Sequence, residues 1–480
     1  MTEQSNAPAY AELHCHSYFS LLDGCSSPEV LVAEARALGL QALALTDHDS
    51  LAGAVRFALA ARPANLHAIL GSEVMLAPLQ AGAPPHHLTL LAETQAGYAN
   101  LCRLISASRC DVLPPIAEDE TPPANWPGKT PPLLTWERLA QHTEGIIALS
   151  GCARGPIAAP LVQGDIDGAQ VAARRLRTLY AGKLYVELQH HSRGGDDLLV
   201  RRLVDVAHKL DLPLVATHNA HYATHAESRL RDALLAIDAN LPLTAARRQG
   251  LLPATSMAHL QSAQAMARRF AGLPQALANT LVIAERCQAS IDFAQHRLPA
   301  FLAPDSAISE FTYLYQLCHA NLNQRYPDLR PAVLTQLAHE LDVIERAHLA
   351  GYFLIVWDLV RFARERGIRC QGRGSAANSI VAYLLGITSI DPLAHNLLFE
   401  RFLSDDRHTT PDIDIDFAAD RREEVIQYCY RRYGRAHTAM VCNVVTYRAR
   451  SALRDLGKVL EFPEAVIDSL VEKRLALRAD

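Results

Sequence analysis

Histidine and acidic residues recur at short spacings in the first half of the chain, where they could bind metal ions. His14 and His16 are one residue apart after a short apolar–polar segment, so in a strand both imidazoles would lie on one side and reach one ion. Imidazole and carboxylate groups suit zinc, manganese or iron, and a bridging carboxylate allows a multi-metal cluster. Such a cluster lowers the pKa of bound water and holds a phosphoester for hydrolysis. A single pair of histidines is weak evidence for a metal site, so the interpretation depends on the recurrence of such residues along the chain.

The recurrence follows the predicted strands. Residues 28–40 have helical apolar spacing, and residues 41–49 then resemble a buried strand that ends in polar residues. Segments 146–152, 184–191 and 212–222 repeat this design, each with Cys, His, Asn or Glu at the end of an apolar run. This alternation predicts an α/β barrel or wound sheet whose ligand site lies at the C-terminal ends of the strands. The proline-rich segment 113–132 predicts an exposed loop insertion.

These segments resemble the polymerase-and-histidinol-phosphatase (PHP) family. The resemblance rests on HCHSYFSLLDG, ALALTDHDSLAGAV, ILGSEV, HHLTLLAETQAGYANL, IALSGCARG and VATHNAHY. It implies a distorted (β/α)7-type barrel with up to three metals, Zn²⁺ or Mn²⁺. By motif position, the implied metal ligands are His14, His16, Asp23, His48, Glu73, His87, Cys152 and His221.

One position departs from the family pattern. Active members have an aspartate two residues before the last ligand histidine, where this chain has Asn219. A neutral amide is a weaker ligand than a carboxylate, so we expect one metal to be lost or loosely held.

A second set of acidic residues lies late in the chain. Asp412, Asp414 and Asp416 alternate with Ile413 and Ile415, so in a strand all three carboxylates would share one face. Three like charges on one face are unfavourable unless cations join them, and two divalent ions would hold the attacking and leaving oxygens in phosphoryl transfer. The alternative is a solvated strand face with the isoleucines buried behind it.

A glycine-rich turn lies about 40 residues upstream of these aspartates. Because such a turn can bind phosphate, its presence favours phosphate chemistry over a solvated strand face. In GRGS the glycines permit close backbone approach to a phosphate, N–H groups at the start of a helix bind it, and Arg373 adds charge. Ser375 would cap the helix or donate a hydrogen bond to a phosphate oxygen. Such turns are common, so this motif alone is weak.

Together, these segments resemble the palm of the C-family DNA polymerases, from GYFLIVWDLVRFARERGI through GRGSAANSIVAYLLGITSIDPLAHNLLFERFL to the aspartates. The resemblance implies an α+β, nucleotidyltransferase-like palm in which Asp412 and Asp414 bind catalytic Mg²⁺, with Asp416 as the weaker third candidate. It implies attack of a primer 3′-hydroxyl on the α-phosphate of a deoxynucleoside triphosphate. The residues implied to touch its phosphates are Gly372, Arg373, Gly374 and Ser375.

Residues 421–460 resemble the start of a helical thumb, whose arginines would follow a DNA backbone with salt-dependent affinity. A solvated basic helix face is the alternative. The segments YAELHCHS, LLPATSMAHLQSAQAMARRF and VVTYRARSALRDLGK favour the error-prone branch of the family. The candidate DNA-binding residues are Arg431, Arg432, Arg435, Arg448, Arg450 and Arg454.

Length and composition bound the organisation. The 480 residues predict two to four domains, assigned as 9–240 (PHP), 241–300 (helical connector), 301–424 (first part of the palm) and 425–480 (start of the thumb). The net charge of −5 excludes a protein coated in basic residues, although a local basic stripe remains compatible with it. The ten cysteines form no CxxC pair, and neither a signal peptide nor a membrane span is evident. We therefore expect reduced thiols, a cytoplasmic location and no membrane contact.

Three functions stay open at this point. The first is the N-terminal part of an error-prone, repair-associated polymerase that acts on primer–template DNA, with a separately encoded C-terminal half or other translesion factors as partners. The resemblance implies a third palm carboxylate and fingers after the thumb, for which no room remains before Asp480, so we expect an incomplete polymerase site. The second is an autonomous PHP phosphoesterase or 3′–5′ exonuclease. The third is a non-catalytic module that binds DNA or a partner.

Overall fold

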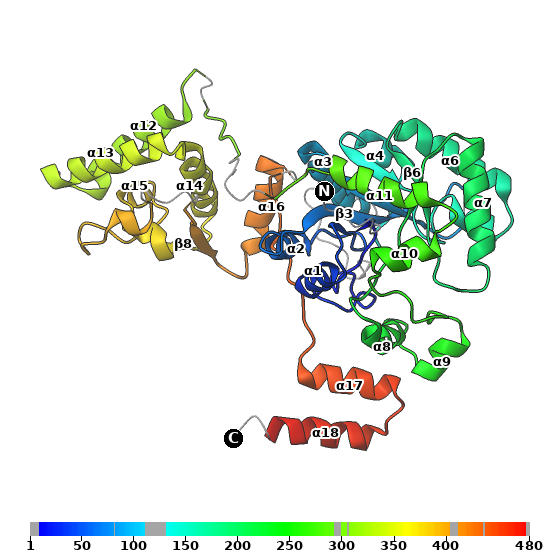
Figure 1. Cartoon of the computed structure of the whole chain (residues 1–480). Coiled ribbons are helices and arrows are strands. Elements are labelled where there is room, and N and C mark those ends of the chain that lie inside the picture. Colours follow the sequence, from blue (N-terminus) through cyan, green and yellow to red (C-terminus); the bar gives the residue numbers. More distant parts are fainter. Residues whose placement is uncertain are drawn as a thin grey trace, which may run out of the picture. The chain divides into compact units, whose positions relative to one another are not determined.

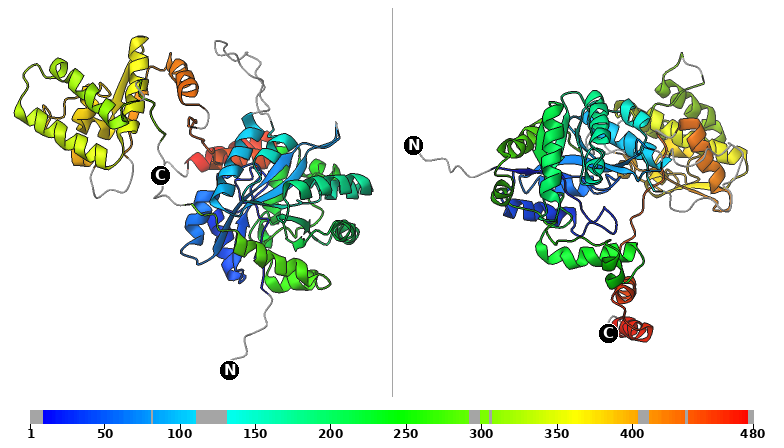
Figure 2. Two further views of the ribbon diagram at one scale, coloured as in Figure 1. Left: turned by 90° about the horizontal axis from the view of Figure 1, so that it is seen from above. Right: turned by 90° about the vertical axis from the view of Figure 1, so that its right-hand side faces the viewer.

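The computed structural model describes residues 9–80, 82–110, 131–291, 299–304, 307–403, 411–434 and 437–476. The chain forms two compact units, whose elements are traced in Figures 1 and 2. The first unit comprises residues 1–291 and 446–480, and the second comprises residues 292–445. The predicted loop at 113–132 lies almost wholly outside the described residues.

The first unit is built on a seven-stranded sheet with the strands in sequence order. All neighbours are parallel except β4, which is antiparallel to both β3 and β5. The sheet curls so that the chain after β1 meets the chain after β7 in a parallel bridge between Cys15 and Ala220. This confirms the predicted α/β fold with a distorted barrel, and β4 is a source of the distortion. The strands are β1 (Ala11–Glu12), β2 (Ala42–Leu45), β3 (His67–Leu76), β4 (His86–Ala92), β5 (Ile146–Leu149), β6 (Leu184–Leu188) and β7 (Leu214–Ala216).

Helices cover this sheet, and their sequences explain where they begin. In α1 the side chain of Ser27 accepts a hydrogen bond from Val30 N, and Pro28 stands in the first turn, where its missing N–H is not needed. The central strands are buried along their length, which accounts for their continuous apolar runs. The helices up to β7 are α1 (Pro28–Ala37), α2 (Ala54–Ala61), α3 (Gln95–Cys110), α4 (Trp136–Gln141), α5 (Ala158–Val162), α6 (Ile166–Leu179) and α7 (Asp196–Lys209).

The predicted connector is helical but interrupted. Its clearest sequence piece divides into two helices around Gly272–Leu273, and Pro274 starts the second of them. The last of these helices returns to the sheet, where it contacts β7 and β1. The elements after β7 are η1 (His225–Glu227), α8 (Ser228–Asp238), α9 (Leu243–Arg248), α10 (Ala263–Arg269) and α11 (Pro274–Arg286).

The second unit is mainly helical, with a two-stranded antiparallel sheet of β8 and β9. Phe353, Leu354 and Ile380 belong to its buried core, and Ile413 and Ile415 pack against that core from the aspartate strand. The elements are α12 (Glu310–Arg325), α13 (Pro331–Arg346), α14 (Ala350–Glu365), β8 (Cys370–Arg373), η2 (Gly374–Asn378), α15 (Ile380–Leu384), η3 (Phe399–Arg401), β9 (Asp414–Phe417) and α16 (Arg422–Tyr433).

The segment 425–480, assigned from the sequence to one region, is divided between the two units. Helix α16 belongs to the second unit, whereas α17 (Ala449–Val459) and α18 (Glu464–Ala476) belong to the first. Val459 is buried in a cluster with Ala236, Ala246 and Leu252, which attaches α17 to the region of α8 and α9. Within the described residues, no helix is long and apolar enough to cross a membrane.

Candidate functional site

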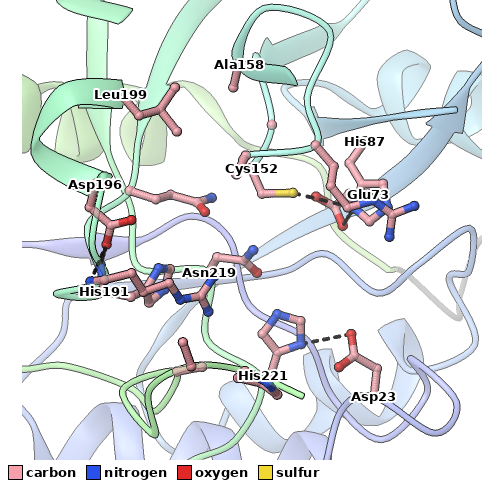
Figure 3. Close-up of a pocket in the computed structure, with 18 of the residues that line it drawn as sticks. Asp23, Glu73, His87, Cys152, Ala158, His191, Asp196, Leu199, Asn219 and His221 are labelled. Atoms are coloured by element: carbon pink, nitrogen blue, oxygen red, sulfur yellow. Dashed lines mark hydrogen bonds and ion pairs between the residues drawn. The ribbon is translucent and has the colours of Figure 1, made fainter. Parts of the chain in front are cut away.

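The predicted metal ligands gather at one rim of the curled sheet, as Figure 3 shows for several of them. Because parallel strands end at the same edge, segments about 200 residues apart in sequence reach this rim together. Six of the nine predicted residues follow strand ends: His14 and His16 after β1, His48 after β2, Cys152 after β5, and Asn219 and His221 after β7.

Glu73 is the centre of the cluster. Its carboxylate lies 3.2 Å from His14 Nε2, 3.0 Å from His48 Nδ1 and 2.8 Å from His87 Nδ1. It is within β3, which continues past the rim and pairs with β4 in a register that sets Met75 opposite His87. The antiparallel direction of β4 therefore brings His87 to the same rim as the other ligands.

Asp23 forms a second centre beside Glu73. Its Oδ2 lies 3.2 Å from His48 Nε2 and 3.1 Å from His221 Nδ1, so His48 bridges the two carboxylates. Arg231, which sequence reasoning missed, donates to Asp23 Oδ1 at 2.9 Å through its Nε. The Cys152 thiol lies 3.6 Å from His87 Nδ1 on the opposite side of the cluster.

A buried layer behind the ligands fixes their orientation. Glu187 Oε1 lies 2.7 Å from His14 Nδ1 and also accepts from Thr217. Asp47, a neighbour of His48, accepts from the Ser17 backbone N–H at 2.7 Å and from Ser20 Oγ at 2.8 Å. Asp47 therefore organises the loop that carries the first histidines. An acidic residue inside the apolar run LYVEL was the one sequence signal for Glu187.

Electrostatics keep this cluster charged although it is buried. Burial would raise the pKa of Glu73, but His87 and His14 hold that pKa well below its usual range. Burial lowers the pKa of His14, and the carboxylates of Glu187 and Glu73 outweigh it and raise that pKa to about 10. Burial and the neighbouring imidazole of His48 hold the pKa of His16 well below its usual range, so His16 is neutral with an available lone pair.

Unsatisfied buried atoms indicate that the cluster fits metal ions. His14 Nε2, His16 Nε2 and Glu73 Oε1 are buried without a hydrogen bond, which is rare for polar atoms in a folded protein, and the 3.2 Å approach of His14 to Glu73 is an ion-pair contact only. Nitrogen and oxygen ligands from these three residues lie within 4.8 Å of one another, as do those from His48, Glu73 and His87. The donor set of imidazoles and a shared carboxylate suits a multi-metal cluster.

Asn219 belongs to the same cavity. It has φ +50°, a left-handed conformation that asparagine tolerates better than most residues, and its Oδ1 is buried without a partner. The cavity has a volume of about 560 Å³ and is lined by Asn219 together with Asp23, Glu73 and Cys152. Figure 3 shows these residues around one opening.

The palm residues lie on the small sheet of the second unit. In the β8–β9 register, Arg373 is opposite Asp414 and Gln371 is opposite Asp416. Arg373 Nη1 lies 3.1 Å from Asp414 Oδ2, and its Nε lies 3.1 Å from Asp416 Oδ2. One guanidinium therefore balances two of the aspartates on this exposed face.

Asp412 lies just before β9, and two contacts hold its backbone. Ser375 Oγ donates to Asp412 O at 3.2 Å, and the next residue, Ile413, donates from its N–H to Tyr352 Oη at 3.1 Å. The expectation that Ser375 caps the following helix is wrong. Ser379 caps α15 instead, because a 3₁₀ turn over Gly374–Asn378 delays the start of the α-helix.

The predicted DNA-binding arginines are divided between the two units. Arg431 and Arg432 lie on α16 in the second unit, and Arg432 also contacts Asp358 at 3.7 Å. Arg448, Arg450 and Arg454 belong to the first unit, where Arg454 pairs with Asp468 at 2.8 Å. Arg435 lies outside the described residues.

Comparison with known proteins matches both regions. Residues 12–191 match the PHP domain, and residues 312–477 match the bacterial DNA polymerase III alpha NTPase domain. An error-prone DNA polymerase of Symbiobacterium thermophilum is 43% identical over 97% of this chain and 42% of its own length. An error-prone DNA polymerase of Mycobacterium bovis is 43% identical over 95% of this chain and 41% of its own. The DNA polymerase III subunit alpha of Treponema pallidum is 37% identical over 95% of this chain and 38% of its own length.

The chain combines a PHP domain with the polymerase III alpha NTPase domain, a combination that defines the alpha-type bacterial DNA polymerases. The chain therefore belongs to the C-family of DNA polymerases. Within it, the two relatives at 43% identity are named error-prone DNA polymerases, and the relative at 37% identity is named a DNA polymerase III alpha subunit. The chain spans about two-fifths of the length of these curated relatives.

Proposed function

We propose that this chain is the PHP- and palm-bearing part of an error-prone DNA-directed DNA polymerase that performs nucleotidyl transfer at Asp412, Asp414 and Asp416. The observation that carries the proposal is the contact between the glycine-rich turn and the aspartate strand, made by Ser375 to Asp412 and by Arg373 to Asp414. This contact supports the proposal, because it joins the turn proposed to bind phosphate to the aspartates proposed to bind metal.

In this proposal Asp412 and Asp414 hold Mg²⁺, with Asp416 as a third carboxylate. The bound ions would supply Lewis-acid stabilisation of the charge that develops during phosphoryl transfer. Arg373 already lies where a cation is needed, which supports the fit of this face to divalent ions. The backbone of Gly372, Gly374 and Ser375, with the Arg373 side chain, would hold the triphosphate of the incoming nucleotide.

Binding by the purified chain tests this assignment without requiring the whole polymerase. Mn²⁺-dependent binding of a deoxynucleoside triphosphate should weaken at least about tenfold in Asp412→Asn, because a charged ligand is lost. Asp420→Asn is the matched control, since Asp420 is an exposed aspartate in the turn that follows β9. Equal weakening in both variants, or none in either, would reject the palm assignment. Primer extension is measured in parallel, with a separately supplied C-terminal half as the proposed partner.

A second candidate function is hydrolysis at the PHP centre, as a phosphoesterase or 3′–5′ exonuclease. It is favoured by the cavity of about 560 Å³ beside the ligands, which Arg154, Arg193 and Arg231 also line. We propose that Zn²⁺ or Mn²⁺ is held there by His14, His16, Glu73 and the surrounding predicted ligands, with Asn219 as a weak neutral ligand. The bound metals would activate water near neutral pH.

The two functions separate in one nuclease assay on primer–template DNA with Mn²⁺ or Mg²⁺. Degradation that is lost in His14→Ala and kept in Asp412→Ala assigns hydrolysis to the PHP centre. Degradation that survives both changes excludes both sites as its source. No degradation with retained DNA binding leaves the non-catalytic, DNA-binding role. We propose that the setting of this activity is cytoplasmic DNA repair. We also propose the domain limits 9–240, 241–300, 301–424 and 425–480.

A further inference from the structure

We propose that the second unit carries a separate binding site for a phosphate-bearing anion, at the C-terminal end of α15. A cavity of about 400 Å³ lies there between α12, α14 and α15. Its polar lining includes Arg325, Arg361, Arg364 and the amides of Asn321 and Gln324. These are the donor types that bind phosphate oxygens in proteins.

The positive charge in this cavity is only partly balanced. Arg361 is neutralised by Asp358 at 2.7 Å and by Glu365 at 3.0 Å. In the described ranges, neither Arg325 nor Arg364 makes an ion pair with a carboxylate. The Arg325 guanidinium instead lies 4.8 Å from the centre of the Tyr383 ring, and Arg364 donates to Gly386 O.

Both unpaired guanidiniums converge on one point of the backbone. Gly386 has φ +74°, and a Cβ at this residue would clash with Arg364 Nη1 and lie 3.2 Å from Arg325 Nη2. Glycine therefore allows two like charges to approach each other, which is unfavourable without an anion between them. A simpler explanation is that Arg364 only binds a free carbonyl at the C-terminal end of α15, through its hydrogen bond to Gly386 O. This explanation does not account for Arg325, the two amide side chains or the cavity.

This cavity is distinct from the proposed nucleotide turn. Helix α15 has five residues, so its ends are separated by about 8 Å, with Gly374–Asn378 before one end and Gly386 after the other. The two places are nevertheless coupled through the backbone, because Gly372 N donates to Ile387 O at 2.8 Å. An anion bound at Gly386 would therefore lie one residue from the hydrogen bond that holds β8.

Trp357 also lines the cavity and provides a local fluorescence signal for the full chain. We expect inorganic phosphate and pyrophosphate to change this signal with saturation, and binding to weaken about tenfold or more in Arg325→Gln and Arg364→Gln. Arg330→Gln, which removes the same charge from an exposed position outside the cavity, should bind as the wild type does. Trp357→Phe should abolish the phosphate-dependent signal, which would show that Trp357 is its source among the three tryptophans.

Two further variants protect the test against misfolding. Arg325→Lys keeps the charge but loses the planar fork, and Gln324→Ala removes one donor, so each should weaken binding less than Arg325→Gln. Circular dichroism checks that all variants fold.

Competition by an oligonucleotide lacking terminal phosphates would identify a DNA backbone phosphate as the source, whereas displacement by pyrophosphate alone would identify a free phosphate ligand. No saturable signal, or equal weakening in Arg330→Gln, would overturn the site. Asp412→Asn should keep this phosphate binding, so the inference stands or fails independently of the polymerase proposal.

Discussion

The cluster of predicted metal ligands in the first unit and the aspartate face of the second unit both gather carboxylates, but in opposite surroundings. The Glu73 and His14 side chains are 1% and 0% exposed, whereas those of Asp414 and Asp416 are 46% and 65% exposed. Six or more chain segments build the buried cluster, and two short strands build the open face. This contrast fits the two proposals, in which the buried cluster holds resident ions and the open face meets ions together with a substrate.

The largest expected effect tests the buried half of this comparison. Glu73→Gln removes the carboxylate shared by His14, His48 and His87, so Zn²⁺ or Mn²⁺ affinity should fall by at least about 100-fold, which corresponds to about 2.7 kcal/mol. Titration calorimetry measures the loss, and the stabilisation of the chain by metal should decrease with it. Glu137→Gln is the control, because Glu137 is exposed on α4. Unchanged metal binding in Glu73→Gln would contradict a Glu73-centred site.

The next effect concerns Glu187, which is buried behind the predicted ligands. Glu187→Gln removes the carboxylate that lies 2.7 Å from His14 Nδ1, and metal affinity should fall about 10- to 100-fold. Calorimetry under the same conditions gives the value. If Glu187→Gln and Glu137→Gln behaved alike, the orientation of His14 would not depend on Glu187.

The contrast also explains what the sequence could predict. The candidate ligands His14, His48 and His221 lie in recognisable motifs at strand ends, and the alternation of Asp412, Asp414 and Asp416 with isoleucine is local, so the sequence could point to both sets of candidates. Glu187 was missed because one acidic residue inside an apolar run has no spacing partner. The reversal of β4 and the cavity at Gly386 depend on which segments pack together, which local patterns do not encode. Likewise, the start of α15 at Ser379 follows from a 3₁₀ turn that GRGS does not specify.

A pH-dependent effect sharpens the comparison inside the second unit. Glu340 is buried there without a histidine or arginine partner among its described contacts, and its oxygens accept from Ser379 Oγ at 2.7 Å and Ile380 N at 3.0 Å. Burial raises its pKa from 4.5 to about 6, the opposite direction to Glu73. Between these pH values the folded state binds more protons than the unfolded state. The contribution of Glu340 to the free energy of unfolding is therefore complete below pH 4.5 and is lost as pH rises through 6.

The expected loss is about 2 kcal/mol of unfolding free energy across that interval. Urea unfolding followed by Trp357 fluorescence measures it, and the difference between wild type and Glu340→Gln removes the contribution of other carboxylates. The amide does not titrate, so Glu340→Gln should lack this pH-dependent component. Parallel pH profiles for the two proteins would show that Glu340 does not titrate in this range.

The smallest effect tests the open half of the comparison. Arg373 bridges Asp414 and Asp416 on an exposed face, where ion pairs contribute little to stability. Arg373→Gln should therefore leave the unfolding transition unchanged while Mn²⁺ binds the aspartate face roughly threefold more tightly, since a competing cation is gone. The same change should weaken deoxynucleoside triphosphate binding, because the Arg373 side chain is proposed to help hold the triphosphate. Paramagnetic relaxation of water protons by Mn²⁺ measures the first effect, with Arg330→Gln as the charge-matched control. Loss of stability in Arg373→Gln would mean that this arginine serves the fold, and that the open face is more rigid than its exposure implies.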